Sequence, residues 1–381
     1  MLIVDVNHGA LILAREYKEM GYDVEVWDIY NKLKDSNNLD VKIVKNPNLN
    51  DYEKIVAPIH CPIDKKFISF HEAVSEIILK KYKNLYKKFI CITGVKGKTT
   101  TTELIFHILK EDYKVFINNS NYGSIAPPAI LEKLSNINID DYDIFIFETS
   151  LGLIRCKYGA ITNVLENYKI AKGKRDALFA KFSTLKLADV GYINIKDIKR
   201  YNLAIEKNNI NVINEPTILK KYPLEFEYCG EIFNFNNKVF GSHLAENASF
   251  AIEICKNFLS LEDIKEKLKN FKIKNRMEIE NVGKHVVIKN INPGLDVKAI
   301  KYAINDFLEV FGGDIYIGGD FGVVCEEIDI KKLCNILKSF KVKYFFIGDI
   351  GKELNKYLEG EFKDKIEIKD DTLIILRTRI K

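Results

Sequence analysis

The chain has 381 residues, of which 47% are hydrophobic and 29% are charged. At about 150 residues per domain, this length predicts two or three domains, and the ordinary globular composition excludes a disordered or fibrous protein. The 58 basic and 53 acidic residues leave a net charge of only +5. Since no basic stripe with interleaved aromatic residues occurs, we expect no nucleic-acid partner.

The sequence also argues against a membrane or secreted protein. No run reaches the roughly 18 uncharged apolar residues that a membrane helix needs, and the N-terminal segment is interrupted by Asp5 and His8, as in a strand and turn rather than a signal peptide. The cysteines are odd in number and form no C-x-x-C pair, so we expect reduced core thiols in a cytoplasmic protein. They are Cys61, Cys91, Cys156, Cys229, Cys255, Cys325 and Cys334.

Apolar runs of strand length alternate with helical periodicity along the whole chain, which predicts an α/β protein with mainly parallel sheets. The first section opens with a strand at 2–6, a helix over about 11–20 and a strand at 23–29. This βαβ unit has no G-x-G-x-x-G, so the dinucleotide-binding fingerprint is absent. A short strand at 54–57 follows, and a charged helix over 71–88 is expected to connect to a new domain.

The remaining elements predict two further sections. The second opens at a strand over 88–93, followed by a glycine loop and a helix over 100–110, and the third begins near Asn275. We therefore predict a small Rossmann-like N-terminal domain at 1–86, a central P-loop ATPase domain at 87–274 and a C-terminal Rossmann-like domain at 275–381. Later strands are predicted at 143–148, 190–194, 285–289, 314–318, 343–347 and 373–376.

The loop between the strand at 88–93 and its helix is typical of nucleotide-phosphate binding. Its glycines let backbone N–H groups approach phosphate oxygens, and the helix N-terminus favours negative charge. We expect Lys98 to reach the β- and γ-phosphates of ATP and Thr99 to bind Mg²⁺. A full Walker motif has a glycine where this chain has Ile92, so the loop is a shorter form. The loop residues are Gly94, Val95, Lys96, Gly97, Lys98, Thr99 and Thr100.

Glu148 ends the buried strand at 143–148. A carboxylate at the carboxyl end of a central strand beside a P-loop is well placed as a second Mg²⁺ ligand. A surface charge at a strand end is the alternative interpretation.

Taken together, these segments resemble the Mur ligase family of ATP-dependent carboxylate ligases. The resemblance extends from residue 93 to about residue 320, and the order and spacing of its motifs make it more specific than any single motif. The matching segments are Thr93–Thr100 (T-G-x-x-G-K-T-T), Glu148–Leu153 (E-x-S-S-x-x-L), Thr162-Asn163-Val164 (T-N-[IV]), Gly241-Ser242-His243 with Asn247 (G-x-H-N-x-x-N) and Asn275-Arg276-Met277-Glu278 (G-R-M-E).

The resemblance implies roles for residues outside the loop. Asn247 falls on the asparagine that contacts adenine, and Arg276 is carried over as a further nucleotide-binding residue. Lys181 falls on the lysine that is carbamylated in many members, where it acts in catalysis with Lys98 and Glu148 and supports a second Mg²⁺. Lys186 is the competing position for this role, and a plain exposed helix lysine is the further alternative.

Three departures from the family pattern bear on the second metal site. The family's Asp-His after the T-N-[IV] segment is replaced by Asn167-Tyr168, the aspartate of its D-Y-A-H-x-P falls on Ile288, and its His-Asn pair is His243-Leu244. These substitutions put the second Mg²⁺ in question.

Four further segments of the chain stand out: Asp5–Ala10, Ala57–Pro62, Asn290–Asp296, and Gly318–Gly322 through Cys325–Glu327. Together they resemble the archaeal coenzyme F(430) synthetases, a branch of this family that acts on a nickel tetrapyrrole. That resemblance implies ATP-dependent closure of the last carbocyclic ring, in which a propionate of the seco-precursor becomes an acyl phosphate that a neighbouring carbon attacks. His8 and His60 follow short strands, so they are candidates for substrate contact or for axial approach to nickel.

Two other functions stay open at this point. A Mur-type amide ligase would join an amino acid to a carboxylate, for instance in pseudomurein or another archaeal cofactor. A nucleotide-gated binding module without ligase chemistry is the second alternative, motivated by Tyr168 and Ile288. We expect a monomer or homodimer in each case.

Overall fold

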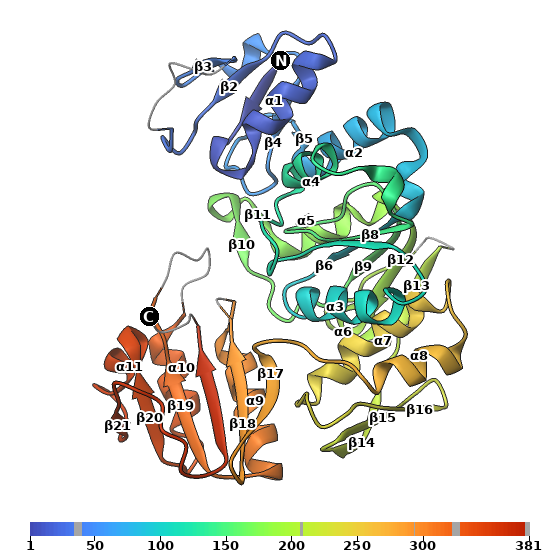
Figure 1. The fold of residues 1–381 in the computed structure, drawn as a ribbon. Helices are drawn as coiled ribbons and strands as arrows, with labels where there is room; N and C mark the ends of the chain where they lie inside the picture. Colours follow the sequence, from blue (N-terminus) through green and yellow to red (C-terminus); the bar gives the residue numbers. More distant parts are fainter. Residues whose placement is uncertain (34–39, 206–208, 293, 322–327, 378–381) are drawn as a thin grey trace. The chain divides into compact units, whose positions relative to one another are not determined.

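The computed structural model describes residues 1–33, 40–205, 209–292, 294–321 and 328–377 (Figure 1). By their contacts the residues divide into two compact units. One consists of Met1–Glu215 with Asn247–Leu259, and the other of Pro216–Glu246 with Ser260–Lys381.

The first unit begins with a parallel five-stranded sheet in the order β3-β2-β1-β4-β5. The adjacent strands β1 and β4 at its centre are short, wholly apolar and buried, as expected for a parallel sheet covered on both faces. The strands are β1 (Leu2–Val4), β2 (Glu25–Trp27), β3 (Lys42–Val44), β4 (Ile55–Ala57) and β5 (Ile68–Ser69), and the helices are α1 (Ala10–Glu19) and α2 (Phe70–Lys81).

The predicted helix over 71–88 is shorter than expected. Helix α2 begins with a capping box between Ser69 and Glu72 and ends at Lys81, and residues 83–88 form a 3₁₀ helix. Lys83 has a φ of 46°, which an α-helix cannot continue through. The apolar face of α2 packs into a core that also contains Phe89 and Cys91, so this helix is part of the packed interior and not a surface connector.

A second, six-stranded parallel sheet of the first unit has the order β13-β12-β9-β6-β8-β7 (Figure 1). Its strands are β6 (Phe89–Thr93), β7 (Val115–Asn118), β8 (Ile144–Glu148), β9 (Cys156–Ile161), β12 (Ala188–Asn194) and β13 (Ile210–Ile213). The connecting elements are α3 (Lys98–Leu109), α4 (Pro127–Ser135), the hairpin β10 (Lys169–Ile170) and β11 (Arg175–Asp176), α5 (Ala177–Ser183) and α6 (Ile195–Tyr201). Helix α7 (His243–Cys255) enters this unit at Asn247.

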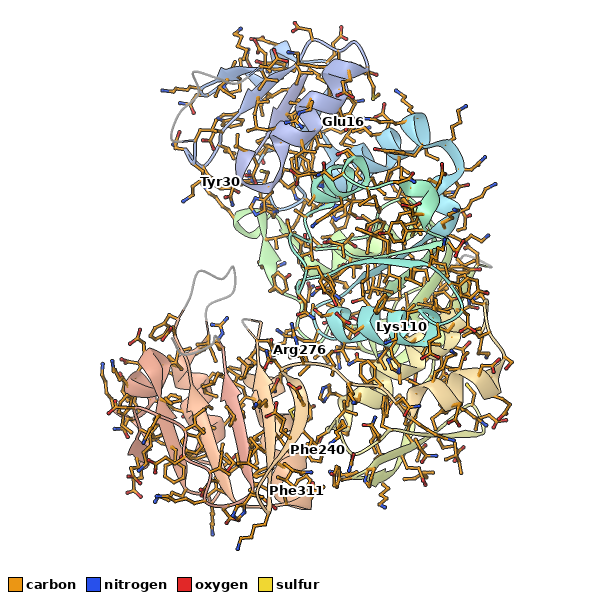
Figure 2. The ribbon with its side chains drawn as sticks, viewed as in Figure 1. Glu16, Tyr30, Lys110, Phe240, Arg276 and Phe311 are labelled. Carbon is orange, nitrogen blue, oxygen red and sulfur yellow. The ribbon has the colours of Figure 1, made fainter. Side chains whose placement is uncertain are left out.

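The second unit holds an antiparallel three-stranded sheet and a six-stranded sheet in the order β17-β18-β22-β19-β20-β21, parallel except for β17. In its core, Phe240 and Phe311 pack edge to face with ring centroids 5.4 Å apart (Figure 2). The strands are β14 (Thr217–Lys221), β15 (Leu224–Tyr228), β16 (Glu231–Asn234), β17 (Arg276–Val282), β18 (His285–Ile291), β19 (Asp314–Gly318), β20 (Tyr344–Ile347), β21 (Glu361–Phe362) and β22 (Thr372–Leu376). The helices are α8 (Leu261–Leu268), α9 (Val297–Val310), α10 (Ile330–Leu337) and α11 (Gly348–Leu354).

The predicted α/β fold with mainly parallel sheets is confirmed. The domain boundaries at residues 86 and 274 stay a prediction. The six cysteines in the described part of the chain are free thiols, and five are buried, but Cys229 is exposed in the turn between β15 and β16. Cys325 lies outside the described residues. Among those residues, every helix is too short or too polar to cross a membrane.

Candidate functional site

The glycine loop lies between β6 and α3, at the carboxyl end of the central strand. Gly94 and Gly97 have φ angles of 148° and 85°, in the region that favours glycine. A Cβ on Gly94 would lie 2.0 Å from Thr162 Oγ1, and one on Gly97 would lie 2.3 Å from Asn247 Oδ1. The loop therefore requires glycine at both positions, for conformation and for space.

The neighbouring strand end holds the loop in shape. After β9, the Asn163 carbonyl accepts a hydrogen bond from the Val95 N–H at 2.8 Å, and Asn163 Oδ1 accepts one from the Lys96 N–H at 3.0 Å. The Thr162 hydroxyl donates to the Lys96 carbonyl at 2.6 Å. The T-N pair thus fixes the backbone that would cradle phosphates.

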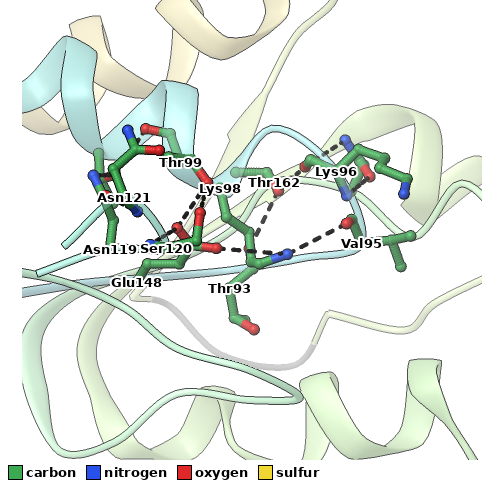
Figure 3. Close-up of polar contacts among 12 residues, drawn as sticks. Thr93, Val95, Lys96, Lys98, Thr99, Asn119, Ser120, Asn121, Glu148 and Thr162 are labelled. Carbon is green, nitrogen blue, oxygen red and sulfur yellow. Dashed lines mark hydrogen bonds and ion pairs between the residues drawn. The ribbon is translucent and has the colours of Figure 1, made fainter. Parts of the chain in front are cut away.

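Lys98, Thr99 and Glu148 come together at this edge of the sheet. Figure 3 shows the Lys98 ammonium between the Val95 carbonyl at 3.3 Å and Glu148 Oε1 at 3.8 Å. The Thr99 hydroxyl donates to Glu148 Oε2 at 2.8 Å, close to the distance of about 3 Å between adjacent ligands of one Mg²⁺. Because Glu148 is only 2% exposed, it is not a surface charge, and these two oxygens fit one hard cation.

Ser120 is part of the same group and was not predicted. Its N–H donates to Glu148 Oε2 at 3.1 Å, and its hydroxyl lies 2.9 Å from Thr99 Oγ1. The sequence carried one weak signal, since Ser120 follows β7, and polar residues after parallel strands gather at one sheet edge.

Substitution of Gly97 by alanine tests the loop geometry. The left-handed φ costs about 1–2 kcal/mol for a residue with a Cβ, and Asn247 must also move, so Gly97→Ala is expected to weaken ATP binding about tenfold or more. Titration calorimetry with ATP measures this. Gly21→Ala is the matched control, because Gly21 has the same φ of 85° with no atom within 4 Å of its added Cβ. Equal ATP affinity in the Gly97 variant would contradict the assignment.

The structure separates the two candidate lysines. Lys181, on α5, is 1% exposed, whereas the side chain of Lys186 is 56% exposed and pairs with Glu72 at 2.8 Å. Beside Lys181 lies His71, whose pKa is lowered to about 4 by burial and further by the Lys181 charge, against a hydrogen bond to the Ser150 carbonyl that raises it. The buried lysine therefore lies next to a neutral imidazole, which contacts the backbone of Ser150, two residues after Glu148 in the chain.

His8 and His60 also come together, around a third residue. Asp5 Oδ2 lies 2.6 Å from His8 Nδ1 and 3.2 Å from His60 Nε2, and the two imidazole rings are 4.4 Å apart at their centroids. The sequence prediction did not include Asp5, although its place directly after the first strand was a usable signal.

Comparisons with known proteins agree with this picture. The chain is 58% identical to the coenzyme F(430) synthetase of Methanocaldococcus jannaschii, in an alignment that covers 100% of this chain and 99% of that protein. The chain belongs to the coenzyme F(430) synthetase family. Residues 279–376 also match the family model described as "Coenzyme F430 synthetase CfbE, C-terminal domain".

The solved structures similar to this coenzyme F(430) synthetase family member are Mur ligases and their relatives. A MurF ligase from Thermotoga maritima in complex with ADP has a TM-score of 0.59 at 13% identity, covering 86% of this chain and 85% of that one. A bifunctional folylpolyglutamate synthase/dihydrofolate synthase from Yersinia pestis, complexed with AMPPNP and a Mn ion, has the same TM-score at 13% identity, covering 83% and 92%. The three-domain Mur ligase fold is thereby confirmed for this family member.

Two of the three departures from the Mur ligase pattern have structural explanations in this coenzyme F(430) synthetase family member. Asn167 Oδ1 and the Tyr168 carbonyl accept hydrogen bonds from the first N–H groups of α5, each at 3.0 Å, so these residues cap the helix that carries Lys181. Ile288 is fully buried in the core of the second unit. An aspartate at this position would be a buried charge, which is costly without a partner.

The other predicted residues lie in different parts of the fold. Asn247, against the loop glycine, belongs to the first unit, and Arg276 starts β17 in the second unit (Figure 2). Pro293 and the residues Gly322 and Cys325–Glu327, which contributed to the resemblance to the coenzyme F(430) synthetases, lie outside the described residues.

Proposed function

We propose that this protein closes the last carbocyclic ring of coenzyme F(430). In this reaction ATP phosphorylates a propionate carboxylate of a nickel tetrapyrrole, the seco-F430 acid, and a neighbouring carbon of the same molecule attacks the acyl phosphate. The full-length identity of 58% to a coenzyme F(430) synthetase carries this proposal. The nickel arrives inside the substrate, so it is not a resident metal of the protein.

The loop and its carboxylate supply what the first step needs. A carboxylate and the γ-phosphate repel each other, and Lys98 with the backbone N–H groups of the loop would offset that charge. Thr99 and Glu148 would hold Mg²⁺, which supplies further charge neutralisation when bound. The 2.8 Å contact between their oxygens supports this pairing.

Three further residues complete the proposed site. Asn247 would contact the adenine, and its amide already lies against the phosphate loop. Arg276 would contribute to nucleotide binding, as the resemblance to the Mur ligases implies. Lys181 would be carbamylated, and its burial supports this role, because a buried ammonium is costly and a carbamate would exchange it for a metal-binding anion.

The second step needs no separate amine site, because the nucleophile and the acyl phosphate belong to one molecule. Holding both ends in one site lowers the barrier by several kcal/mol, since the translational entropy is already lost on binding. The protein's part in this step is to orient the two ends and to exclude water from the acyl phosphate.

Phosphate release from ATP and Mg²⁺ tests the function. We expect the nickel seco-tetrapyrrole to stimulate release at least about tenfold above a panel of amino acids with carboxylate acceptors, and to change its visible spectrum as the ring closes. Stimulation only by an amine with a carboxylate partner would reassign the protein to amide ligation. Binding of ATP without stimulation by any candidate would indicate a nucleotide-gated binding module.

A further inference from the structure

Asp5 and His60 lie at the topological switch point of the N-terminal sheet. Strand β1 is central in the order β3-β2-β1-β4-β5, and the chain moves to its other side at β4. Asp5 directly follows β1, and His60 follows β4 by three residues, with His8 in the short 3₁₀ helix after β1. Ligands of open parallel sheets bind at this point, outside the carboxyl ends of the strands.

The ionised Asp5 carboxylate sets which nitrogen of each neutral imidazole carries the hydrogen. Burial raises the pKa of the carboxyl, but hydrogen bonds and charge from His60 and His8 outweigh it and lower the pKa to about 2. Asp5 is therefore ionised at neutral pH and can only accept. His8 donates from Nδ1 and His60 from Nε2, so in each neutral ring the lone pair is on the other nitrogen.

The three side chains differ in exposure as expected for an acid–base site, with the carboxylate buried and the imidazoles accessible. Asp5 is 0% exposed, and its second oxygen, Oδ1, is buried with no hydrogen-bond partner among the described residues. The side chains of His8 and His60 are 32% and 22% exposed, so a bound molecule can reach the imidazoles but not the carboxylate. A buried carboxylate behind an accessible imidazole orients and stabilises its protonated form.

The loop that carries His60 is tied to the elements around Lys181. Arg175, in the hairpin just before α5, donates to the Ile59 carbonyl at 2.9 Å and also to the Cys61 carbonyl. Positive charge on His60 and on Lys181 lowers the pKa of the same buried His71. Within the first unit, Arg175 thus connects the loop of His60 to the hairpin that precedes α5, the helix of Lys181.

The contact between Asp5 and His8 has the length of a hydrogen bond. Asp5 Oδ2 and His8 Nδ1 are 2.6 Å apart, as in a charge-assisted hydrogen bond. The ligand atoms of Asp5, His8 and His60 lie within 4.8 Å of one another, so a metal centre is the competing interpretation that the experiment below tests.

We infer that Asp5, His8 and His60 form the proton-accepting site of ring closure, with His60 as the general base. This inference rests on the proposed function. As the C–C bond forms, the nucleophilic carbon loses its C–H bond and the proton passes to His60 Nδ1. The C–O bond of the acyl phosphate breaks, and phosphate leaves with its electron pair. Asp5 holds both rings, and His8 keeps the carboxylate ionised beside the new imidazolium.

Trapping of the acyl phosphate with hydroxylamine separates the two chemical steps. In His60→Gln the amide can still donate to Asp5, but no base remains at the position of Nδ1. We expect this variant to form the hydroxamate from the tetrapyrrole at a rate close to that of the unmodified protein, with ring closure slower by about 10²–10⁴-fold. Asp5→Asn should likewise keep hydroxamate formation and slow ring closure. The variant should fold, since asparagine tolerates the φ of 79° at this position.

His285→Gln is the matched control, because His285 is 21% exposed and also faces an aspartate, Asp371, at 4.0 Å. It should change neither step. Ring closure within about threefold of normal in His60→Gln would overturn the base assignment, as would an equal loss of hydroxamate and ring closure. If the unmodified protein bound one equivalent of metal and Asp5→Asn lost it, the three residues would form a metal centre and not a proton-accepting site. Absence of tetrapyrrole-dependent ADP release in the unmodified protein would instead refute the proposed function, and the inference with it.

Discussion

Lys98→Ala is expected to reduce tetrapyrrole-stimulated phosphate release by at least about 10²–10³-fold, the usual effect of removing one group that stabilises transition-state charge. The ammonium lies at the start of α3, 3.8 Å from Glu148, beside the loop whose N–H groups are proposed to bind the phosphates. Its cation is the side-chain charge best placed to offset the negative charge that accumulates as the γ-phosphoryl group moves to the carboxylate. Release of phosphate under saturating ATP and Mg²⁺ measures the loss.

Lys110→Ala provides the control for this substitution. Lys110 lies at the opposite end of the same helix, as its C-cap (Figure 2), and its removal should leave turnover unchanged. Near-normal turnover in Lys98→Ala would refute the phosphate assignment and leave the glycine loop as a structural turn.

The arrangement of the residues proposed to bind ATP could largely be predicted from the sequence, because these residues are close in the chain or follow strands directly. The P-loop needs only β6, α3 and two glycines, all of which are local features. Glu148 could be placed because parallel strands end at one edge, and β8 is indeed the neighbour of β6. The distance from Thr99 could not be predicted, since it depends on sheet order.

The group around Asp5 shows where prediction from the sequence stops. His8 and His60 were candidates from their positions after strands, but the carboxylate that joins them is fully buried and follows an apolar run. The pairing depends on β1 lying between β2 and β4, and a single sequence does not determine that order. The end of α2 was also missed, because a left-handed residue such as Lys83 leaves no compositional signal.

Glu148→Ala is expected to raise the Mg²⁺ concentration needed for half-maximal turnover at least tenfold. Removing a residue that only supports a metal ligand typically costs about 10–100-fold in metal affinity, and Glu148 is proposed as a direct ligand. Its carboxylate is also the shared acceptor for the Thr99 hydroxyl and the Ser120 N–H. The alanine variant therefore loses both the ligand and the group that orients the remaining hydroxyl. Titration of turnover with Mg²⁺ at saturating ATP measures this change.

Glu148→Gln separates the loss of charge from any loss of folding. Glutamine keeps an oxygen that can accept from Thr99 and Ser120, so the buried donors stay paired, but it removes the negative charge that attracts the ion. The Mg²⁺ requirement should rise in this variant also, while thermal unfolding without Mg²⁺ stays close to normal. Glu132→Gln, at an exposed position of α4, should leave the titration unchanged. An unaltered Mg²⁺ titration in both Glu148 variants would mean that the carboxylate only positions Thr99 and Lys98, and that the metal is held by Thr99 and the phosphates alone.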